Sequence, residues 1–374
     1  MQIERISPAE ALRRQRAGAR LIDVREVSER AAGHAEGALG VPRAELEAHP
    51  ERFVSARSDA VVLICQSGVR SLRAAEALHA AGYPHVASVD GGTARWVSEA
   101  LPTVRGVDAD FHERYSRHLR LPEVGEAGQR RLNASSVLLV GAGGLGSPVA
   151  LYLAAAGVGR IVLVDDDVVD RSNLQRQVLH TDARIGLAKV ESGRASLEAL
   201  NPSLRIDGAR VRIDSGNVEA LVEPVDVVID GADNFATRYL LNDACVHLRK
   251  PLVYGAVHRF EGQLSVFDAG RRRGEAPCYR CLFPEPPPAE AAPNCAEAGV
   301  LGVLPGVIGL LQATETVKLL LGIGESLAGR LVHFDALAMR FRDTRLTPDP
   351  DCPVCAPGRE FPGYIDYARF CASQ

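Results

Sequence analysis

Short apolar runs alternate with amphipathic stretches along residues 1–101. Three runs have the length and composition typical of buried strands: residues 21–24, 61–65 and 86–89. Residues 71–81 have helical apolar spacing and stop at Gly82, and Ser7 opens a capping box that ends at Glu10. Strands that alternate with helices predict a parallel sheet that is covered on both faces.

The same alternation resumes after residues 102–110, which contain proline and glycine but no apolar periodicity. We place a linker there, between a first domain at residues 1–101 and a second α/β domain at residues 111–374. The second domain's expected strands are residues 137–140, 161–164 and 226–229, and its expected helices are residues 147–156, 186–200 and 234–248. After Lys250 the pattern changes to strands such as residues 263–267, which predicts a mixed-sheet part.

One apolar stretch raises the question of a membrane segment. The most apolar run, residues 298–311, is broken by Pro305 and is shorter than the roughly 20 residues that a bilayer requires. We expect residues 302–321 to form a buried helix instead. The N-terminus lacks the apolar core of a signal peptide. These features predict a cytoplasmic protein without a membrane partner.

Composition narrows the class of protein further. The net charge is −4 at pH 7, so there is no basic excess to bind nucleic acid by counterion release. Lysine occurs only at positions 189, 250 and 318, although lysine and arginine together number 43. The chain has eight cysteines, which in a reducing compartment are more typical of metal ligands or nucleophiles than of disulfides.

The first candidate site follows the predicted strand at residues 61–65. Cys65 opens the sequence CQSGVRS, which joins this strand to a helix. The backbone N–H groups of such a loop, the helix dipole and the Arg70 charge all stabilise a thiolate, so we expect a nucleophilic Cys65 with a lowered pKa. Tyrosine-phosphatase-like loops place five residues between cysteine and arginine, around a tetrahedral phosphate. Only four lie between Cys65 and Arg70, and this tighter loop fits a single sulfane sulfur.

A glycine-rich loop in the second domain is the second candidate site. The sequence GAGGLG at residues 141–146 follows a strand and opens a helix, where backbone N–H groups bind phosphates. Asp165 ends the next strand, at the place of a ribose-binding acid. This pattern alone fits an NAD-dependent dehydrogenase equally well. The spacing of Arg176, Lys189 and Asp233 favours a nucleoside triphosphate with magnesium, because an ammonium contacts phosphate as a point charge.

Two Cys-x-x-Cys pairs form a third candidate site: Cys278 with Cys281, and Cys352 with Cys355. Four thiolates in a reduced compartment predict a tetrahedral structural Zn²⁺ site that ties the C-terminus to the domain. Either pair alone would fit a redox dithiol. Cys295 follows the proline-rich residues 284–293, and a cysteine on such a segment can reach a reactive acyl group. Cys245 is expected to be a small buried hydrophobic residue.

These motifs resemble two known families. Residues 1–101 are similar to the rhodanese family, through residues 21–26, residues 33–38, the Cys65 loop and residues 91–96. This resemblance implies that Cys65 carries a persulfide. Residues 111–355 resemble the MoeB/ThiF family, relatives of ubiquitin-activating enzymes that adenylate the C-terminal glycine of small β-grasp proteins. Relatives that combine both modules usually carry the rhodanese domain at the C-terminus, whereas here it comes first.

The second resemblance implies a Rossmann-like, doubly wound ATP-binding domain with a defined set of contacts. The residues that would contact ATP or its Mg²⁺ are Gly144, Asp165, Ser172, Asn173, Leu174, Gln175, Arg176, Lys189, Asp233 and Asn234. Arg117 would reach the triphosphate of a neighbouring subunit, which implies a homodimer. Cys295 matches the position at which some relatives capture the carrier as a thioester or acyl disulfide. The family also has the same four-cysteine zinc arrangement.

The expected reaction joins both domains. The second domain would adenylate the C-terminal Gly-Gly carboxylate of a ubiquitin-like β-grasp sulfur-carrier protein, and the Cys65 persulfide would attack to leave a thiocarboxylate. Because the carboxylate is already ionised, catalysis requires positioning and charge neutralisation by Arg117, Arg176, Lys189 and Mg²⁺.

The partners and the rival functions stay open at this point. The preferred carrier is the small subunit of molybdopterin synthase, the alternative is the thiamin-pathway carrier, and the sulfur donor is thiosulfate or a cysteine desulfurase. Three rival classes are a dehydrogenase, a phosphatase or arsenate reductase at Cys65, and an adenylyltransferase whose rhodanese module only docks a partner.

Overall fold

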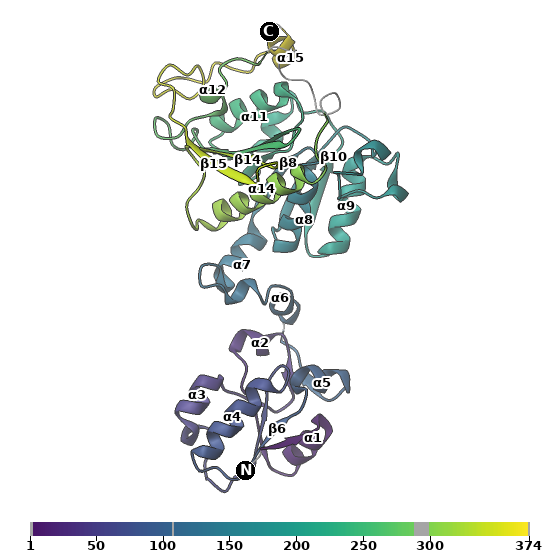
Figure 1. Ribbon diagram of the computed structural model, residues 1–374, viewed down its shortest axis with the longest axis vertical. Coiled ribbons are helices and arrows are strands. Elements are labelled where there is room, and N and C mark those ends of the chain that lie inside the picture. Colours follow the sequence, from purple (N-terminus) through teal and green to yellow (C-terminus); the bar gives the residue numbers. More distant parts are fainter. Residues whose placement is uncertain (1–2, 107, 288–298, 373–374) are drawn as a thin grey trace. The chain divides into compact units, whose positions relative to one another are not determined.

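The computed structural model describes residues 3–106, 108–287 and 299–372. Its contacts divide the chain into two compact units, Met1–Gly125 and Glu126–Gln374. The segment expected as a linker, residues 102–110, holds a two-residue strand, β7, and the start of α6. Both units have an α/β architecture, which confirms the predicted fold class (Figure 1).

The first unit is built on a five-stranded sheet in the order β1-β6-β5-β2-β4. Every strand pair in this sheet is parallel. β3 and β7 form a separate antiparallel pair. The strands are β1 (Glu4–Ile6), β2 (Arg20–Asp23), β3 (His34–Ala35), β4 (Leu39–Gly40), β5 (Val61–Ile64), β6 (Val86–Val89) and β7 (Thr103–Val104); the helices are α1 (Pro8–Arg16), α2 (Val27–Ala31), α3 (Arg43–Ala48), α4 (Val69–Ala80), α5 (Gly92–Ser98) and α6 (Ala109–Arg114).

Successive side chains along a strand point to opposite faces of the sheet, so they pack into two separate cores. Leu63 of β5 packs in the core under α3 and α4, whereas its neighbour Ile64 packs in the core under α1 and α5. The expected helix start is confirmed, because the Ser7 hydroxyl accepts a hydrogen bond from the Glu10 N–H at 3.2 Å. The sheet is therefore covered on both faces, as the sequence predicted.

The second unit contains an eight-stranded mixed sheet in the order β10-β9-β8-β11-β12-β13-β14-β15. The pairs from β10 to β12 are parallel and those from β12 to β15 are antiparallel. The strands are β8 (Ser136–Val140), β9 (Arg160–Val164), β10 (Arg205–Ala209), β11 (Val227–Asp230), β12 (Leu252–His258), β13 (Glu261–Phe267), β14 (Arg330–Asp335) and β15 (Arg340–Arg345); the helices are α7 (Gly125–Ala134), α8 (Gly146–Ala156), α9 (Lys189–Leu200), α10 (Val218–Val222), α11 (Phe235–His247), α12 (Tyr279–Leu282), α14 (Leu304–Leu321) and α15 (Tyr367–Ala372).

Helices cover both faces of this sheet. α14 packs against α8 and β12, and Figure 1 shows α11 on the other side of the strands. Among the described residues, α14 is long and apolar enough to cross a membrane. However, 56% of its residues are buried inside the protein. Pro305 stands in its first turn, so the proline starts this helix rather than interrupting the apolar run. The expected buried helix is confirmed.

The glycine loop after β8 makes a close backbone contact that can be tested. A Cβ atom added at Gly146 would lie 1.8 Å from the Gly141 carbonyl oxygen, so the loop would have to move. We expect Gly146→Val to lower the free energy of unfolding by about 3 kcal/mol, measured by chemical denaturation. Gly306→Ala is the matched control, because nothing lies within 4 Å of its added Cβ. A Gly146→Val chain as stable as wild type would contradict this account.

Candidate active sites

Cys65 lies directly after β5, at the carboxyl end of the parallel sheet in the first unit. Its side chain is buried, and its Sγ accepts hydrogen bonds from the Gly68 N–H at 3.2 Å and from the Ser71 hydroxyl at 3.4 Å. Burial acts to raise the pKa of the Cys65 thiol, but these hydrogen bonds outweigh it and the pKa is lowered. The loop therefore favours a thiolate.

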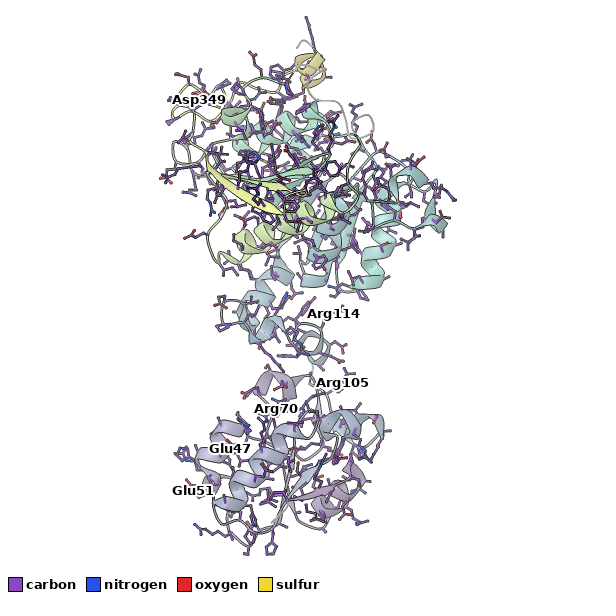
Figure 2. All side chains as sticks on the ribbon, in the orientation of Figure 1. Glu47, Glu51, Arg70, Arg105, Arg114 and Asp349 are labelled. Carbon is purple, nitrogen blue, oxygen red and sulfur yellow. The ribbon has the colours of Figure 1, made fainter. Side chains whose placement is uncertain are left out.

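The Arg70 side chain is held by a residue that the sequence did not single out. Both of its terminal nitrogens donate to the Glu29 carboxylate at 2.8 Å. Figure 2 labels Arg70 among the side chains of the first unit. Arg120 also contacts Glu29 at 2.8 Å. Hydrogen bonds from Arg70 lower the pKa of Glu29 to about 2, so this carboxylate stays ionised. Arg70 is thus part of a three-residue ion-pair cluster, and Glu29 neutralises much of the charge expected to act on Cys65.

A buried ion pair, separate from this cluster, also contacts the Cys65 loop. Asp23 and Arg25 are almost fully buried and form a two-bonded pair with a shortest distance of 2.7 Å. Arg25 also donates to the Gln66 side chain at 3.0 Å. These contacts place Asp23 and Arg25 as structural supports of the loop. Trp96, the only tryptophan, is buried in the neighbouring core.

In the second unit, a cavity of about 940 Å³ lies at the carboxyl ends of the parallel strands. The glycine loop follows β8, Asp165 follows β9 and Asp233 follows β11, so three strand ends meet there. The predicted residues that line the cavity are Gly144, Asp165, Arg176, Lys189, Asp233 and Asn234. Ser172, Asn173, Leu174 and Gln175 are not among its lining residues. Asn173 instead accepts a hydrogen bond from the Arg176 guanidinium at 2.7 Å.

The Lys189 ammonium is buried at the start of α9, between two carboxylates. Its Nζ lies 2.9 Å from Asp167 and 4.0 Å from Asp165. Asp165 also accepts the Ala142 N–H of the glycine loop at 2.8 Å. Sequence reasoning missed Asp167, although the run of three aspartates at residues 165–167 was a usable signal.

Two further residues near the cavity were also missed. His180 is buried behind the glycine loop, with Nε2 2.8 Å from the Ala142 carbonyl oxygen and Nδ1 2.9 Å from the Ser192 hydroxyl. Burial lowers the pKa of His180, so the ring stays neutral. Arg238 lines the cavity and lies 3.5 Å from buried Asp230, whose pKa burial raises to about 6.

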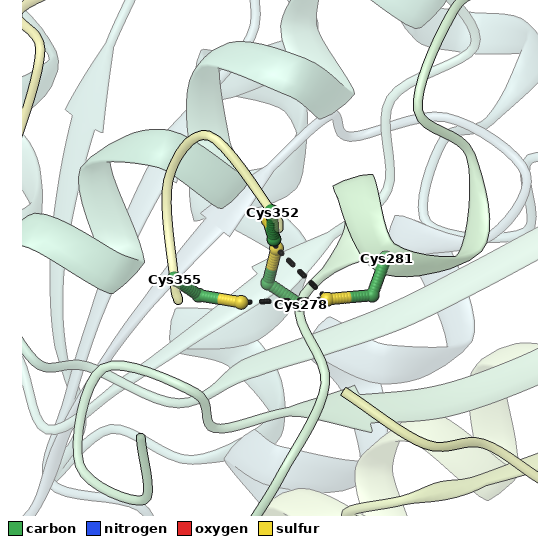
Figure 3. A group of neighbouring side chains, drawn as sticks. All are labelled: Cys278, Cys281, Cys352 and Cys355. Atoms are coloured by element: carbon green, nitrogen blue, oxygen red, sulfur yellow. Dashed lines mark hydrogen bonds between the residues drawn. The ribbon is translucent and has the colours of Figure 1, made fainter. Parts of the chain in front are cut away.

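The four paired cysteines meet in one cluster (Figure 3), with all four Sγ atoms within 4.8 Å of one another. Cys278 lies 3.6 Å from Cys352, and Cys281 lies 3.4 Å from Cys355. A tetrahedral site with Zn–S bonds of about 2.3 Å places sulfur atoms about 3.8 Å apart. The donor set and these distances therefore fit Zn²⁺.

The remaining candidates lie outside these clusters. Cys295 falls outside the described residues. Arg117 belongs to the first unit, is exposed and stands just ahead of a short 3-10 helix, His118–Arg120, and its role at a neighbouring subunit stays a prediction. Cys245 is buried in α11, and burial raises the pKa of its thiol. Cys371 lies in α15 and lines the cavity of the second unit.

Comparison with known proteins finds two families along the chain. Residues 7–99 match the rhodanese-like domain, and residues 115–354 match the ThiF family. The chain is 51% identical over 267 residues to the SAMP-activating enzyme E1 of Haloferax volcanii, which covers 71% of this chain and 97% of that protein. It is 50% identical over 278 residues to the sulfur carrier protein adenylyltransferase of Thermus thermophilus, which covers 74% of this chain and 98% of that protein.

A third relative combines two activities in its name. The chain is 53% identical over 259 residues to the adenylyltransferase and sulfurtransferase MOCS3 of Anopheles gambiae, covering 69% of this chain and 58% of that protein. Among solved structures, E. coli MccB aligns with a TM-score of 0.57 and 20% identity, over 72% of this chain and 80% of that chain. At that identity the likeness to MccB shows the fold alone.

The hydrogen bonds around Cys65 lead to a test of its acidity. Ser71→Ala removes the hydroxyl that donates to Sγ, so we expect the pKa of Cys65 to rise. The measurement is the pH dependence of thiolate absorbance, taken as the difference from a Cys65→Ala chain. Ser98→Ala, in which the lost hydroxyl bonds only its own helix at the Arg95 carbonyl, is the control. If the titration midpoint of the Cys65 thiol is the same in Ser71→Ala and in wild type, the role given to this hydroxyl is refuted.

The cysteine cluster leads to a test of metal content. Cys352→Ala removes one of four ligands, so we expect bound zinc per chain to fall sharply and the melting temperature to drop. Elemental analysis of purified protein and thermal unfolding measure the two effects. Cys371→Ser should leave the zinc content unchanged, since Cys371 is not in the cluster. Equal zinc in wild type and Cys352→Ala would rule out this site.

Proposed function

The chain belongs to the ThiF family and carries a rhodanese-like domain ahead of the ThiF region, and from this premise we propose that it activates a ubiquitin-like sulfur-carrier protein. The enzyme is an adenylyltransferase with sulfurtransferase activity. It adenylates the carrier's C-terminal carboxylate and then converts that group into a thiocarboxylate. The observation that carries the proposal is the pairing, in one chain, of a cavity beside a glycine loop, lined by both cations and carboxylates, with a buried cysteine whose pKa is lowered.

The cavity supports the first step through charge. The carrier's carboxylate and the triphosphate are both anions, so the barrier is their mutual repulsion. Arg176, Lys189 and Arg238 line the cavity together with several carboxylates, so phosphates that enter it can take over as partners of these cations. The glycine loop supplies backbone N–H groups. Asp233 is exposed in the same cavity, and its carboxylate would hold Mg²⁺ against the triphosphate. The carboxylate oxygen attacks the α-phosphorus, and pyrophosphate leaves.

The Cys65 loop supports the second step. A persulfide on Cys65 attacks the acyl carbon of the adenylate, and AMP leaves to give an acyl disulfide. A second thiol then attacks the Cys65 sulfur, which releases the thiocarboxylate and leaves a disulfide to be reduced by an external thiol. We assign this resolving role to Cys295, at the position where the family resemblance implies a cysteine that can also capture the carrier as a thioester or acyl disulfide. The lowered pKa of Cys65 favours a reactive module over one that only docks a partner.

The finer assignments extend this proposal. The molybdopterin synthase small subunit is the preferred carrier, and the thiamin-pathway carrier is the alternative. Arg117 is assigned to the triphosphate of a neighbouring subunit in a homodimer. The family match also assigns four consecutive residues to the nucleotide: Ser172, Asn173, Leu174 and Gln175. Asn173 supports that assignment indirectly, because its side chain orients Arg176. Zn²⁺ in the four-cysteine cluster is structural, and the sulfur donor is thiosulfate or a cysteine desulfurase.

A reaction with purified carriers tests the proposal. Each carrier is mixed with the enzyme, Mg-ATP and thiosulfate, and its mass is followed for one oxygen-to-sulfur exchange at the C-terminus. We expect exchange with wild type, and we expect Asp233→Ala to lose carrier-dependent ATP–pyrophosphate exchange because its metal-binding carboxylate is gone. Cys65→Ala should keep carrier-dependent pyrophosphate exchange but lose the oxygen-to-sulfur exchange on the carrier. Near-normal pyrophosphate exchange in a folded Asp233→Ala chain would sink the assignment of the cavity.

A further inference from the structure

The C-terminal residues 357–372, here called the strap, lie beyond the ThiF match, which ends at residue 354. Aromatic side chains recur along the strap at every third position: Phe361, Tyr364, Tyr367 and Phe370. Such a repeat is unusual in a chain with only 5% aromatic residues. It indicates a segment with its own docking face rather than a loose tail.

The face that receives the strap is one side of α11. Tyr239, Asp243 and His247 are spaced four apart and so share one face of that helix. Phe361 stacks on His247 with ring centroids 4.2 Å apart, and Phe370 packs edge-on against Tyr239 at 5.3 Å. The strap therefore runs antiparallel to α11 along most of its length.

A buried polar cluster fixes the middle of the strap. The Tyr367 hydroxyl donates to the Asp243 carboxylate at 2.8 Å, and Arg280 makes three hydrogen bonds to the same carboxylate. The Arg280 guanidinium contacts both the Phe370 and the Tyr239 rings, at 5.0 and 4.9 Å from their centroids. Tyr367, Asp243 and Arg280 are all more than nine-tenths buried. Arg280 stands between Cys278 and Cys281, so the cysteine cluster and the strap share one anchoring element.

This docking makes the strap part of the cavity wall. Ala368 and Cys371 line the cavity together with Asp233 and Phe283. Ahead of α15, the Ile365 carbonyl lies 3.5 Å from the Ser215 hydroxyl. Ser215 follows Ile213 by two residues, and Ile213 lines the cavity. The strap thus closes one side of the cavity with small side chains, which leave room for a ligand.

We propose that the strap shields the activated carrier in this cavity from water, a role that rests on the proposed adenylation. Water that reaches the acyl-adenylate adds to the acyl carbon, the acyl–oxygen bond breaks, and AMP leaves with the carrier's carboxylate restored. Each such event consumes one ATP without forming a thiocarboxylate. A wall that excludes water keeps the acyl group for the persulfide.

The test measures how much AMP forms per thiocarboxylate. The full chain is assayed with Mg-ATP, thiosulfate and each of the two candidate carriers, the molybdopterin synthase small subunit and the thiamin-pathway carrier. Phe370→Ala, which uncovers Arg280, and a chain ended after Pro357 should raise the AMP-to-thiocarboxylate ratio several-fold. Tyr367→Phe keeps the ring and loses only the bond to Asp243, so it should give a smaller increase. Arg369→Ala, an exposed position on the same helix, is the matched control and should keep the wild-type ratio.

The outcomes separate this inference from the proposed function. Thermal unfolding shows which variants remain folded, and carrier-dependent pyrophosphate exchange is measured in each. Absence of exchange in wild type with both the molybdopterin synthase small subunit and the thiamin-pathway carrier refutes the proposed function and the shielding role with it. Exchange in wild type, with the same ratio in every folded variant, overturns the shielding role alone. Loss of exchange in a folded strap variant also overturns it, because the strap would then serve adenylation itself.

Discussion

The contact between the glycine backbones after β8 and β11 is the constraint on which the cavity depends. The Gly231 N–H donates to the Val140 carbonyl oxygen at 2.8 Å, and a Cβ added at Gly141 would lie 2.5 Å from the Gly231 carbonyl oxygen. Any side chain at these positions would push the two loops apart. Because the loops after β8 and β11 are in contact, the glycine loop and Asp233 face one cavity. Parallel neighbouring strands end at the same edge of the sheet, and these glycines turn that common edge into a single site.

Charge is arranged around this cavity in compensated groups. Lys189 lies between Asp165 and Asp167, and Arg238 lies beside Asp230. A nucleotide adds negative charge, so its phosphates and metal would redistribute these pairs. The same principle appears in the first unit, where Glu29 neutralises Arg70. At Cys65 the stabilisation of a thiolate therefore rests on hydrogen bonds from the loop more than on a free guanidinium.

The second unit also shows how a segment outside a family pattern becomes part of a site. The cysteine cluster holds the chain near Cys352 and Cys355 against residues 278–281, which contain Arg280. From there the strap returns along α11, and its Phe370 ring packs against the same arginine. The buried Asp243 carboxylate needs donors because an unpaired buried charge is costly, and Arg280 and Tyr367 provide them. This shared requirement explains why the metal-binding element and the strap are adjacent.

Local patterns in the sequence were enough to predict the α/β class, most strands and helices, the glycine loop and the four-cysteine cluster. Strand and helix periodicity, turn-forming glycines and Cys-x-x-Cys spacing are properties of short segments. The tertiary structure alone decided which distant groups meet. Glu29 is 41 residues from Arg70, and Tyr367 is 124 residues from Asp243, and no local pattern encodes either contact. Packing of the helices onto the sheet selects those partners, because a buried charge or hydroxyl binds whichever complementary group the fold brings within reach.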